Sequence, residues 1–206
     1  MKSFNRAIAN TRTPALEDLV DGKTRDENEH VFYARIVNFE ELKRASVMIK
    51  QEQWEIRVKH TAANLGAGQL RVRKSITDNL VEYEFTIKTK KSDGNRFENS
   101  NEISAEGFEM FRQLAECGMI KHRYEFPSGQ AKPWQVDVFL RPDGTYYNYC
   151  KIDLEVDDMS LPLPAFPIQL EEVIREIGDK MPAEQRSKVT KLYDEYFITR
   201  PSMLTK

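Results

Sequence analysis

The sequence is poor in the residues that mark several common protein classes. Its two cysteines, Cys117 and Cys150, lie far apart and lack the paired spacing of a zinc site or a disulfide-rich secreted domain. Its three histidines are scattered, which argues against a histidine metal centre. No apolar run is long enough to cross a bilayer, and the first residues lack the apolar core of a secretory signal. We therefore expect a cytoplasmic protein with reduced thiols and no membrane partner.

An excess of positive charge is also missing. The 206 residues include 31 Lys and Arg against 33 Asp and Glu, which gives a formal net charge of -2. This balance argues against a protein that coats DNA without specificity, because such proteins are strongly basic. It still permits a local basic groove, because acidic residues gather in other segments, such as 153–158. The 40% hydrophobic content is typical of a globular domain.

Charge at every second residue of several short segments is the main positive signal. The segments are residues 54–59, 70–73, 83–90, 121–124 and 149–155. Alternation with a period of two predicts a sheet with one apolar face and one charged face. Most of the charge is basic, and it could form a surface or lumen that holds phosphate. The candidate phosphate-binding residues are Arg57, Lys59, Arg71, Arg73, Lys88, Lys90, Lys121, Arg123 and Lys151.

The order of predicted elements is strand, helix, three strands, helix, three strands and two final helices. The strands are expected at 31–37, 53–60, 69–76, 81–90, 120–126, 134–141 and 146–156, and the helices at 38–50, 104–118, 168–179 and 182–197. Pro142, Asp143 and Gly144 predict a hairpin turn, and Gly118 predicts a helix stop. We expect an arm over 1–29, a sheet domain over 30–160 and helices over 161–206 that pack on it.

Several short motifs on these strands match one family. Residues 70–73 (LRVR) are similar to an LRxR strand, 85–88 (FTIK) to LTxK, and 121–123 (KHR) to KxR. Residues 136–139 (VDVF) are similar to an xDxF strand, and 152–155 (IDLE) to a terminal ExE strand. With the element order, these motifs resemble the CYTH domain, or triphosphate tunnel metalloenzyme fold. The resemblance implies an α+β protein with an antiparallel β-barrel or a strongly curved sheet and flanking helices.

The resemblance also implies a chemistry for the charged face. In the family, lysines and arginines grip phosphates, while carboxylates hold Mg²⁺ or Mn²⁺, hard ions that prefer oxygen ligands. Here the implied metal ligands are Asp153 and Glu155. The family's opening ExExK strand is matched poorly, because residues 31–35 (VFYAR) keep only the basic position, as Arg35, and 55–59 (EIRVK) keep one glutamate. A lumen with its cations and without all its carboxylates would bind phosphate better than it hydrolyses it.

The first functional hypothesis is therefore a protein that binds phosphate-rich ligands, above all RNA, with no cofactor required and little or no catalysis. Tyr147 and Tyr149 are expected on the same face of the predicted strand as Lys151 and are candidates for stacking on bases. The alternative is an Mg²⁺- or Mn²⁺-dependent triphosphatase acting on RNA 5′ ends, nucleotides or a small triphosphate. It would use Asp153 and Glu155, with Glu55, Glu82 or Glu84 as further ligands.

A third hypothesis assigns no ligand to the charged face. Charged alternation is also the ordinary solvated side of an antiparallel sheet, and opposite charges often pair across strands. Asp153 and Glu155 would then be ion-pair partners of Arg71 or Arg73. The chain would be a protein-interaction module, with a protein partner or a second copy docked on the helices of 161–206.

Overall fold

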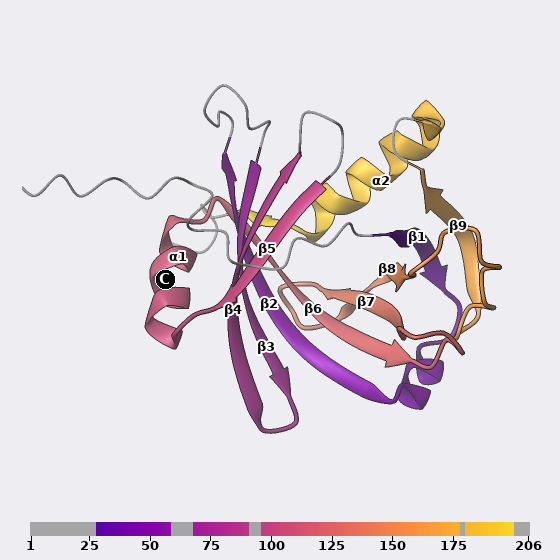
Figure 1. Cartoon of the computed structure of the whole chain (residues 1–206), viewed down its shortest axis with the longest axis horizontal. Helices are drawn as coiled ribbons and strands as arrows, with labels where there is room; N and C mark the ends of the chain where they lie inside the picture. The colour runs from indigo at the N-terminus through magenta and orange to yellow at the C-terminus, as the bar shows by residue number, and fades with distance from the viewer. Residues whose placement is uncertain (1–27, 59–67, 91–95, 178–179, 200–206) are drawn as a thin grey trace, which may run out of the picture.

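A computed structural model describes residues 28–58, 68–90, 96–177 and 180–199 as one curled, ten-stranded antiparallel sheet with few helices (Figure 1). The strand order is β5-β4-β3-β2-β6-β7-β8-β1-β9, and β10 pairs with β6. The strands are β1 (Glu29–Ile36), β2 (Val47–Val58), β3 (Gly68–Thr77), β4 (Leu80–Lys90), β5 (Arg96–Glu102), β6 (Cys117–Phe126), β7 (Trp134–Leu140), β8 (Tyr146–Glu155), β9 (Leu170–Glu176) and β10 (Ile198–Thr199). The helices are η2 (Phe39–Arg44, 3₁₀), α1 (Ala105–Leu114) and α2 (Ala183–Tyr196).

The predicted strongly curved antiparallel sheet is confirmed, but a closed barrel is not seen. Among the described strands, no hydrogen-bonded ladder joins the two edge strands, β5 and β9. Residues 1–27, which make up most of the predicted arm, and Lys59 lie outside the described residues. In the described part of the chain, no helix combines the length and the apolar character that a bilayer crossing requires.

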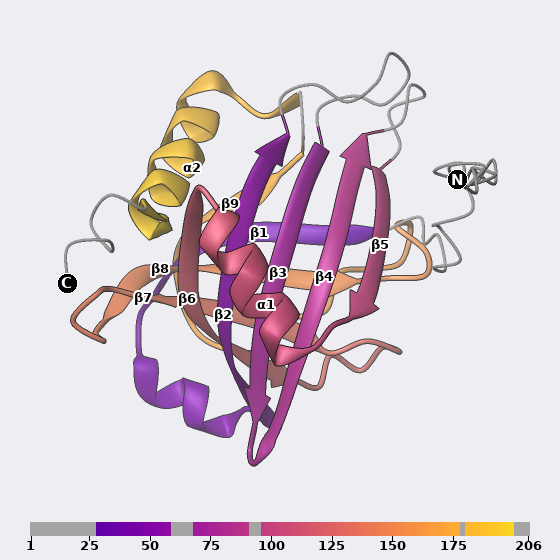
Figure 2. The same ribbon diagram turned by 90° about the vertical axis from the view of Figure 1, so that its left-hand side faces the viewer.

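Helix α1 covers the outer face of β2, β3 and β4 (Figure 2). The strand alternation turns Trp54 and Val72 outward, where they pack against Phe108 of the helix. Ser104 starts the helix, because its hydroxyl accepts a hydrogen bond from the backbone N–H of Gly107 at 3.1 Å. This packing leaves the inner face of the same three strands to the charged residues.

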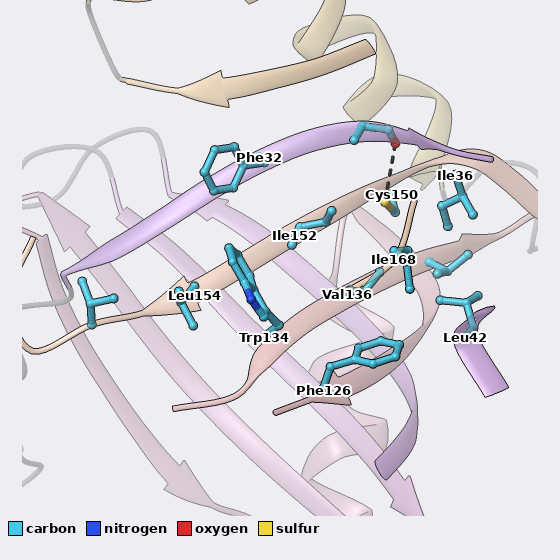
Figure 3. Packing of buried hydrophobic residues seen from close by; sticks show 13 residues of the cluster. Phe32, Ile36, Leu42, Phe126, Trp134, Val136, Cys150, Ile152, Leu154 and Ile168 are labelled. Atoms are coloured by element: carbon cyan, nitrogen blue, oxygen red, sulfur yellow. Dashed lines mark hydrogen bonds between the residues drawn. The ribbon is translucent and has the colours of Figure 1, made fainter. Parts of the chain in front are cut away.

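The larger core lies on the outer face of β1, β7 and β8 (Figure 3). Trp134, Ile152 and Leu154 are almost fully buried there, and Leu42 of η2 packs against the same cluster. Cys150 belongs to this core, and both cysteines are buried and free of a disulfide, in line with the predicted reduced thiols. Each of these strands therefore buries its outer residues and presents the alternate ones to the interior of the curl.

Helix α2 packs against the inner, concave face of the sheet. Its Val189, Leu192 and Tyr196 form a second core with Tyr33 and Phe139. The Tyr196 ring stacks on Phe139, with 4.0 Å between centroids and 7° between planes. The C-terminal helix thus fills part of the space that the curled sheet encloses.

Gly118 does not stop a helix, as the sequence predicted. Helix α1 ends at Leu114, and Gly118 lies inside β6, opposite Trp54 of β2. A Cβ atom at position 118 would lie 2.4 Å from Cε3 of Trp54, closer than packed atoms approach. Glycine is needed here because the indole ring covers the backbone. The predicted hairpin turn is confirmed, since Gly144 has a φ of +83° and donates to the carbonyl of Arg141 at 2.9 Å.

Three other element predictions were wrong. A helix was predicted over 168–179, but its described part, 168–177, contains β9, which pairs with the edge of β1 and satisfies backbone groups that would otherwise lack partners. The predicted helix at 38–50 is the short η2, capped by Asn38, and β2 begins already at Val47. Strand β5 was not predicted, because RFENSNE lacks apolar alternation and is held by its pairing with β4.

Candidate functional site

A cavity of about 1030 Å³ occupies the concave side of the sheet. Its lining comes from strands of both halves of the sheet and from Tyr193 of α2. On β3 the inward residues Gln69, Arg71 and Arg73 alternate with residues that pack toward α1. The period-two pattern of the sequence therefore builds the wall of this cavity.

Six of the nine predicted basic residues line the cavity. They are Arg71, Arg73, Lys88, Lys121, Arg123 and Lys151. Arg57 and Lys90 lie on the described strands β2 and β4, but their side chains are outside the described part of the structure. The structure brings the six side chains together, and their binding of phosphate stays a prediction.

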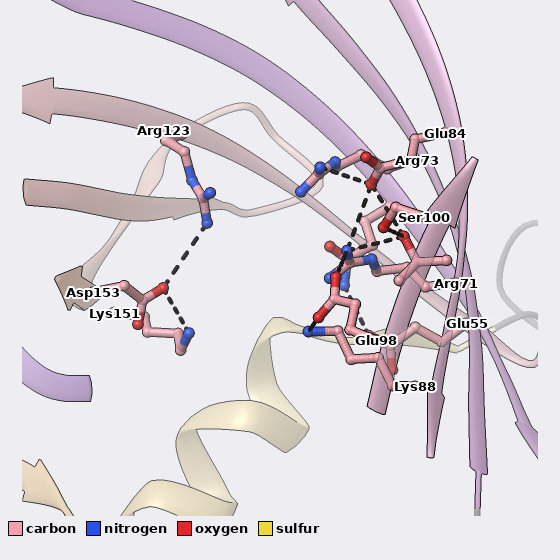
Figure 4. Close-up of polar contacts among 12 residues, drawn as sticks. Glu55, Arg71, Arg73, Glu84, Lys88, Glu98, Ser100, Arg123, Lys151 and Asp153 are labelled. Carbon is pink, nitrogen blue, oxygen red and sulfur yellow. Dashed lines mark hydrogen bonds and ion pairs between the residues drawn. The ribbon is translucent and has the colours of Figure 1, made fainter. Parts of the chain in front are cut away.

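The first group of charges, the β3–β5 wall, consists of Arg71, Arg73, Glu84, Lys88 and Glu98 (Figure 4). Arg73 donates to Glu84 at 2.8 Å, and Arg71 donates to Glu98 at 3.1 Å. Lys88 also contacts Glu98. The Nε atoms of both arginines are buried and have no hydrogen-bond partner. Burial, followed by the nearby Arg71 charge, lowers the pKa of Arg73.

The second group, the β6–β8 wall, consists of the lining residues Lys121, Arg123, Lys151 and Asp153, together with the fully buried Asp137 that pairs with them. Figure 4 shows Arg123, Lys151 and Asp153 across from the first group. Arg123 donates to both carboxylate oxygens of Asp137, from Nε at 2.7 Å and from Nη2 at 2.8 Å. Lys121 donates to the same carboxylate. Lys151 donates to Asp153 at 2.6 Å. Every cation of this wall therefore has a short contact with a buried carboxylate.

Burial and pairing shift the pKa values of this wall in different directions. Burial alone would raise the pKa of Asp137, but Arg123 and Lys121 outweigh it and hold that pKa well below its usual range. Burial lowers the pKa of Lys121 more than Asp137 raises it. For Lys151 burial also acts to lower the pKa, but Asp153 together with Tyr193, Asp137 and Glu29 outweighs it, and the pKa is raised. Asp137 therefore stays ionised, whereas Lys121 loses its proton more readily than a free lysine and Lys151 less readily.

The predicted metal ligands both lie at the cavity. Asp153 is 4% exposed, and its Oδ1 atom has no hydrogen-bond partner, while its Oδ2 accepts from Lys151. Glu155 lies 3.9 Å from Lys132 and is opposite Glu29 in the β1–β8 ladder. Within the described ranges, no three His, Cys, Asp or Glu side chains are grouped so that they could hold a metal ion. These residues do not form a ready metal site, and Asp153 and Glu155 stay predicted ligands.

Other predicted residues lie in different places. Glu55 and Glu84 line the cavity, whereas Glu82 is exposed and is not part of the lining. Tyr147 and Tyr149 are not part of the lining either, because their rings pack beside α2. The Tyr147 hydroxyl donates to the backbone carbonyl of residue 195 at 2.8 Å, so this ring supports the helix.

Arg35, the single match to the opening strand of the family, is not at the cavity. It is partly exposed and pairs with Glu171 and Glu172 at an irregularity between β1 and β9. Sequence reasoning missed Tyr193 and Glu176, which line the cavity from the C-terminal part of the chain. It also missed Asp137 as a site residue, although the VDVF motif marked its strand.

The lining is nearly balanced in charge. Its Lys and Arg side chains are Arg71, Arg73, Lys88, Lys121, Arg123, Lys132 and Lys151. Its Asp and Glu side chains are Glu29, Glu55, Glu84, Glu98, Asp153, Glu155, Asp157 and Glu176. A bare polyanion would therefore meet a lumen in which cations and carboxylates alternate, and it would have to displace internal carboxylate partners.

Comparisons with known proteins give no family. No protein-family model matches the chain, and no curated protein matches it. Among solved structures, the chain resembles the hypothetical protein NE1496, with 20% identity over 65% of this chain and 78% of the other, at a TM-score of 0.39. It also resembles PH1819 from Pyrococcus horikoshii OT3, with 16% identity over 84% and 94% and a TM-score of 0.42. A "putative adenylate cyclase" (bh2851) from Bacillus halodurans gives 14% identity over 66% and 82% and a TM-score of 0.42. The identities and TM-scores are low, so these likenesses carry no information about function.

Proposed function

We propose that this chain is a CYTH-like protein whose cavity binds a compact ligand carrying several phosphates. One observation carries the proposal: six lysine and arginine side chains from facing walls of a curled sheet converge on a single cavity. The Arg71 and Arg73 side chains come from the LRVR motif, and Lys121 and Arg123 come from the KHR motif. Guanidinium groups bind phosphate oxygens through paired, charge-assisted hydrogen bonds.

The size of the cavity favours a compact ligand over the body of a polymer. Its volume of about 1030 Å³ is at the upper end of the roughly 300–1,000 Å³ range of small-molecule sites. Helix α2 takes up part of the concave side, which reduces the room for a continuous strand of nucleic acid. RNA stays a candidate ligand through its 5′ phosphates, which are compact enough for the lumen.

The Arg71 and Arg73 side chains would bind phosphate by exchanging hydrogen-bond acceptors. Their Nε atoms are buried, so a phosphate would contact the Nη2 groups, which donate to Glu98 and Glu84 in this structure. A phosphate oxygen between the two arginines would accept from these groups. It would also compete with Glu84 and Glu98 for the guanidinium groups, so affinity depends on how easily the glutamates move aside.

The direct test is calorimetric titration of the protein with sodium tripolyphosphate, with EDTA present and at two salt concentrations. We expect saturable binding that weakens as salt rises, because the contacts are ionic. Arg73→Gln should weaken binding at least tenfold, since charge-assisted hydrogen bonds are lost. Lys74→Gln is the matched control, because Lys74 follows on the same strand and lies over the Tyr83 ring, away from the lining.

Four outcomes would change the proposal. Absence of binding by the unaltered protein would overturn it, as would equal losses in Arg73→Gln and Lys74→Gln. An RNA that binds equally with a 5′-triphosphate and a 5′-hydroxyl would place the RNA contacts outside the cavity. Release of phosphate from tripolyphosphate after addition of Mn²⁺ would replace simple binding by metal-dependent hydrolysis.

A further inference from the structure

The strongest feature that the proposed function does not use is a chain of three side chains where α2 meets the cavity. Tyr193 of α2 is part of the cavity lining, as is Glu176 of β9. The hydroxyl of Tyr33, a fully buried residue of β1, donates to the hydroxyl of Tyr193 at 2.7 Å. It also lies 3.3 Å from Oε2 of Glu176. In this series of hydrogen-bonded side chains, Tyr33 lies between the Glu176 carboxylate and the Tyr193 hydroxyl.

The protonation of these groups makes Tyr193 a donor. Burial raises the pKa of Tyr33 and of Tyr193, so both phenols keep their protons at neutral pH. A phenol has one proton to donate and can accept another hydrogen bond. The single proton of Tyr33 faces two acceptors, the Tyr193 hydroxyl at 2.7 Å and Oε2 of Glu176 at 3.3 Å. The shorter contact takes this proton, and the proton of Tyr193 is left for a further acceptor. The charge of Lys151 acts on Tyr193, so the two side chains are close enough to interact with the same phosphate.

The surrounding contacts fix the Tyr193 ring in position. It packs edge-on against Tyr33, with 5.5 Å between ring centroids and 68° between ring planes. On the same helix, Leu192 and Tyr196 are buried against the sheet, and Tyr196 stacks on Phe139. A donor held on a packed helix loses little conformational freedom when it binds, which favours its use for recognition.

We propose that the Tyr193 hydroxyl is a ligand-binding group, delivered by the C-terminal helix, that donates a hydrogen bond to a phosphate oxygen beside Lys151. This inference rests on the proposed function and adds a neutral donor from a third element to the cations of the two walls. Tyr33 acts through Tyr193 and is a positioning residue. Glu176 is a second and more distant acceptor for the Tyr33 proton.

The test is the affinity for tripolyphosphate of Tyr193→Phe, which keeps the ring and removes only the hydroxyl. We expect a loss of about tenfold, the usual effect of removing one hydrogen bond to a charged group. The matched control is Tyr196→Phe, three residues along the same helix, whose hydroxyl donates to the backbone carbonyl of residue 149 at 3.3 Å. It should leave the affinity within about twofold of the unaltered protein. Tyr33→Phe should give an intermediate loss.

The outcomes separate this inference from the proposed function. If the unaltered protein does not bind tripolyphosphate, the proposed function fails first. If it binds and Arg73→Gln weakens it, but Tyr193→Phe does not, only the role of Tyr193 is overturned. Urea unfolding of each variant shows whether the helix stays packed, and an affinity loss that tracks a loss of stability equally in Tyr193→Phe and Tyr196→Phe would also overturn it.

Discussion

The two walls of the cavity carry similar charges in different settings. In the β3–β5 wall, the side chains of Lys88 and Glu84 are 33% and 30% exposed. In the β6–β8 wall, Lys121 is 8% exposed and Asp137 is fully buried. The glutamates of the first wall are long and partly solvated, whereas the aspartates of the second are short and enclosed. One wall can exchange its partners for a ligand, and the other depends on its ion pairs to stay folded.

We therefore expect the β3–β5 wall to bind the ligand and the β6–β8 wall to stabilise the fold. A buried ion pair that loses one partner leaves an uncompensated charge and is strongly destabilised. A half-exposed pair can rearrange at small cost, because water replaces the lost partner. The difference therefore lies in the carboxylates. Arg73 and Arg71 pair with Glu84 and Glu98, which are 30% and 18% exposed, and under the proposed function these glutamates would move aside for a phosphate.

The largest expected effect is that of Asp137→Asn. The change removes the carboxylate that accepts from Arg123 and Lys121, and leaves two buried cations without their partner. We expect a loss of about 3–5 kcal/mol in the free energy of unfolding, measured with urea. Glu84→Gln, the corresponding change on the other wall, should cost less than about 1 kcal/mol. Similar losses in the two variants would remove the distinction between the walls.

The same aspartate predicts the response to acid. Its folded pKa is lower than the unfolded value of about 3.9, so its contribution to stability is complete above that value. The contribution is lost as pH falls through the range between the unfolded and the folded pKa, with a limiting slope of about 1.4 kcal/mol per pH unit. Urea unfolding at pH 7, 5, 4 and 3 measures this. A stability that does not change below pH 4 would contradict the assignment.

The third prediction concerns the pairing of β2 with β6, which joins the two halves of the sheet. Gly118 of β6 faces Trp54 of β2, and Gly118→Ala would place a methyl group against the indole ring. Overpacking of this kind costs about 1–3 kcal/mol, which urea unfolding would show. Gly107→Ala in α1 is the control, because its nearest new contact is at 3.6 Å and alanine favours helices. A stable Gly118→Ala protein would mean that the two strands shift easily.

The smallest expected effect is a change in ligand affinity, and it tests the role of Glu84 in the β3–β5 wall. Glu84 competes with a phosphate for Arg73, so Glu84→Gln should raise the affinity for tripolyphosphate about threefold, through a change of roughly 0.7 kcal/mol. Calorimetric titration at low salt gives the measurement. A weaker affinity would show that Glu84 holds Arg73 in its binding position instead of competing for it.

The sequence alone predicted which residues of the walls share a face of the sheet, because alternation along a strand is a local property. Each strand places Arg71 and Arg73 on one face and Val72 on the other, and no distant residue is needed to decide this. The same rule placed Trp54 on the apolar side, where it packs near α1. The curvature of the antiparallel sheet did not follow from alternation, since it was expected only from the resemblance of the motifs and the element order to the CYTH domain.

The sequence was insufficient where pairing over a long distance decides the structure. Residues 170–176 have an apolar spacing that also fits a helix, and only the open edge of β1 makes them a strand. The place of Tyr193 in the cavity depends on its contact with Tyr33, 160 residues earlier. No motif marks either tyrosine, because one hydrogen bond between distant aromatic residues leaves no periodic signal.

The unpaired edges of the sheet have a consequence for ligand size. A closed barrel has an interior width fixed by its strand number and stagger. Among the described strands, β5 and β9 share no ladder, so the circumference is not fixed by hydrogen bonds on that side. The curl can widen or narrow while every described strand pair stays intact. Under the proposed function, ligands of different girth could therefore meet the same pattern of charges, because the width of the curl is adjustable.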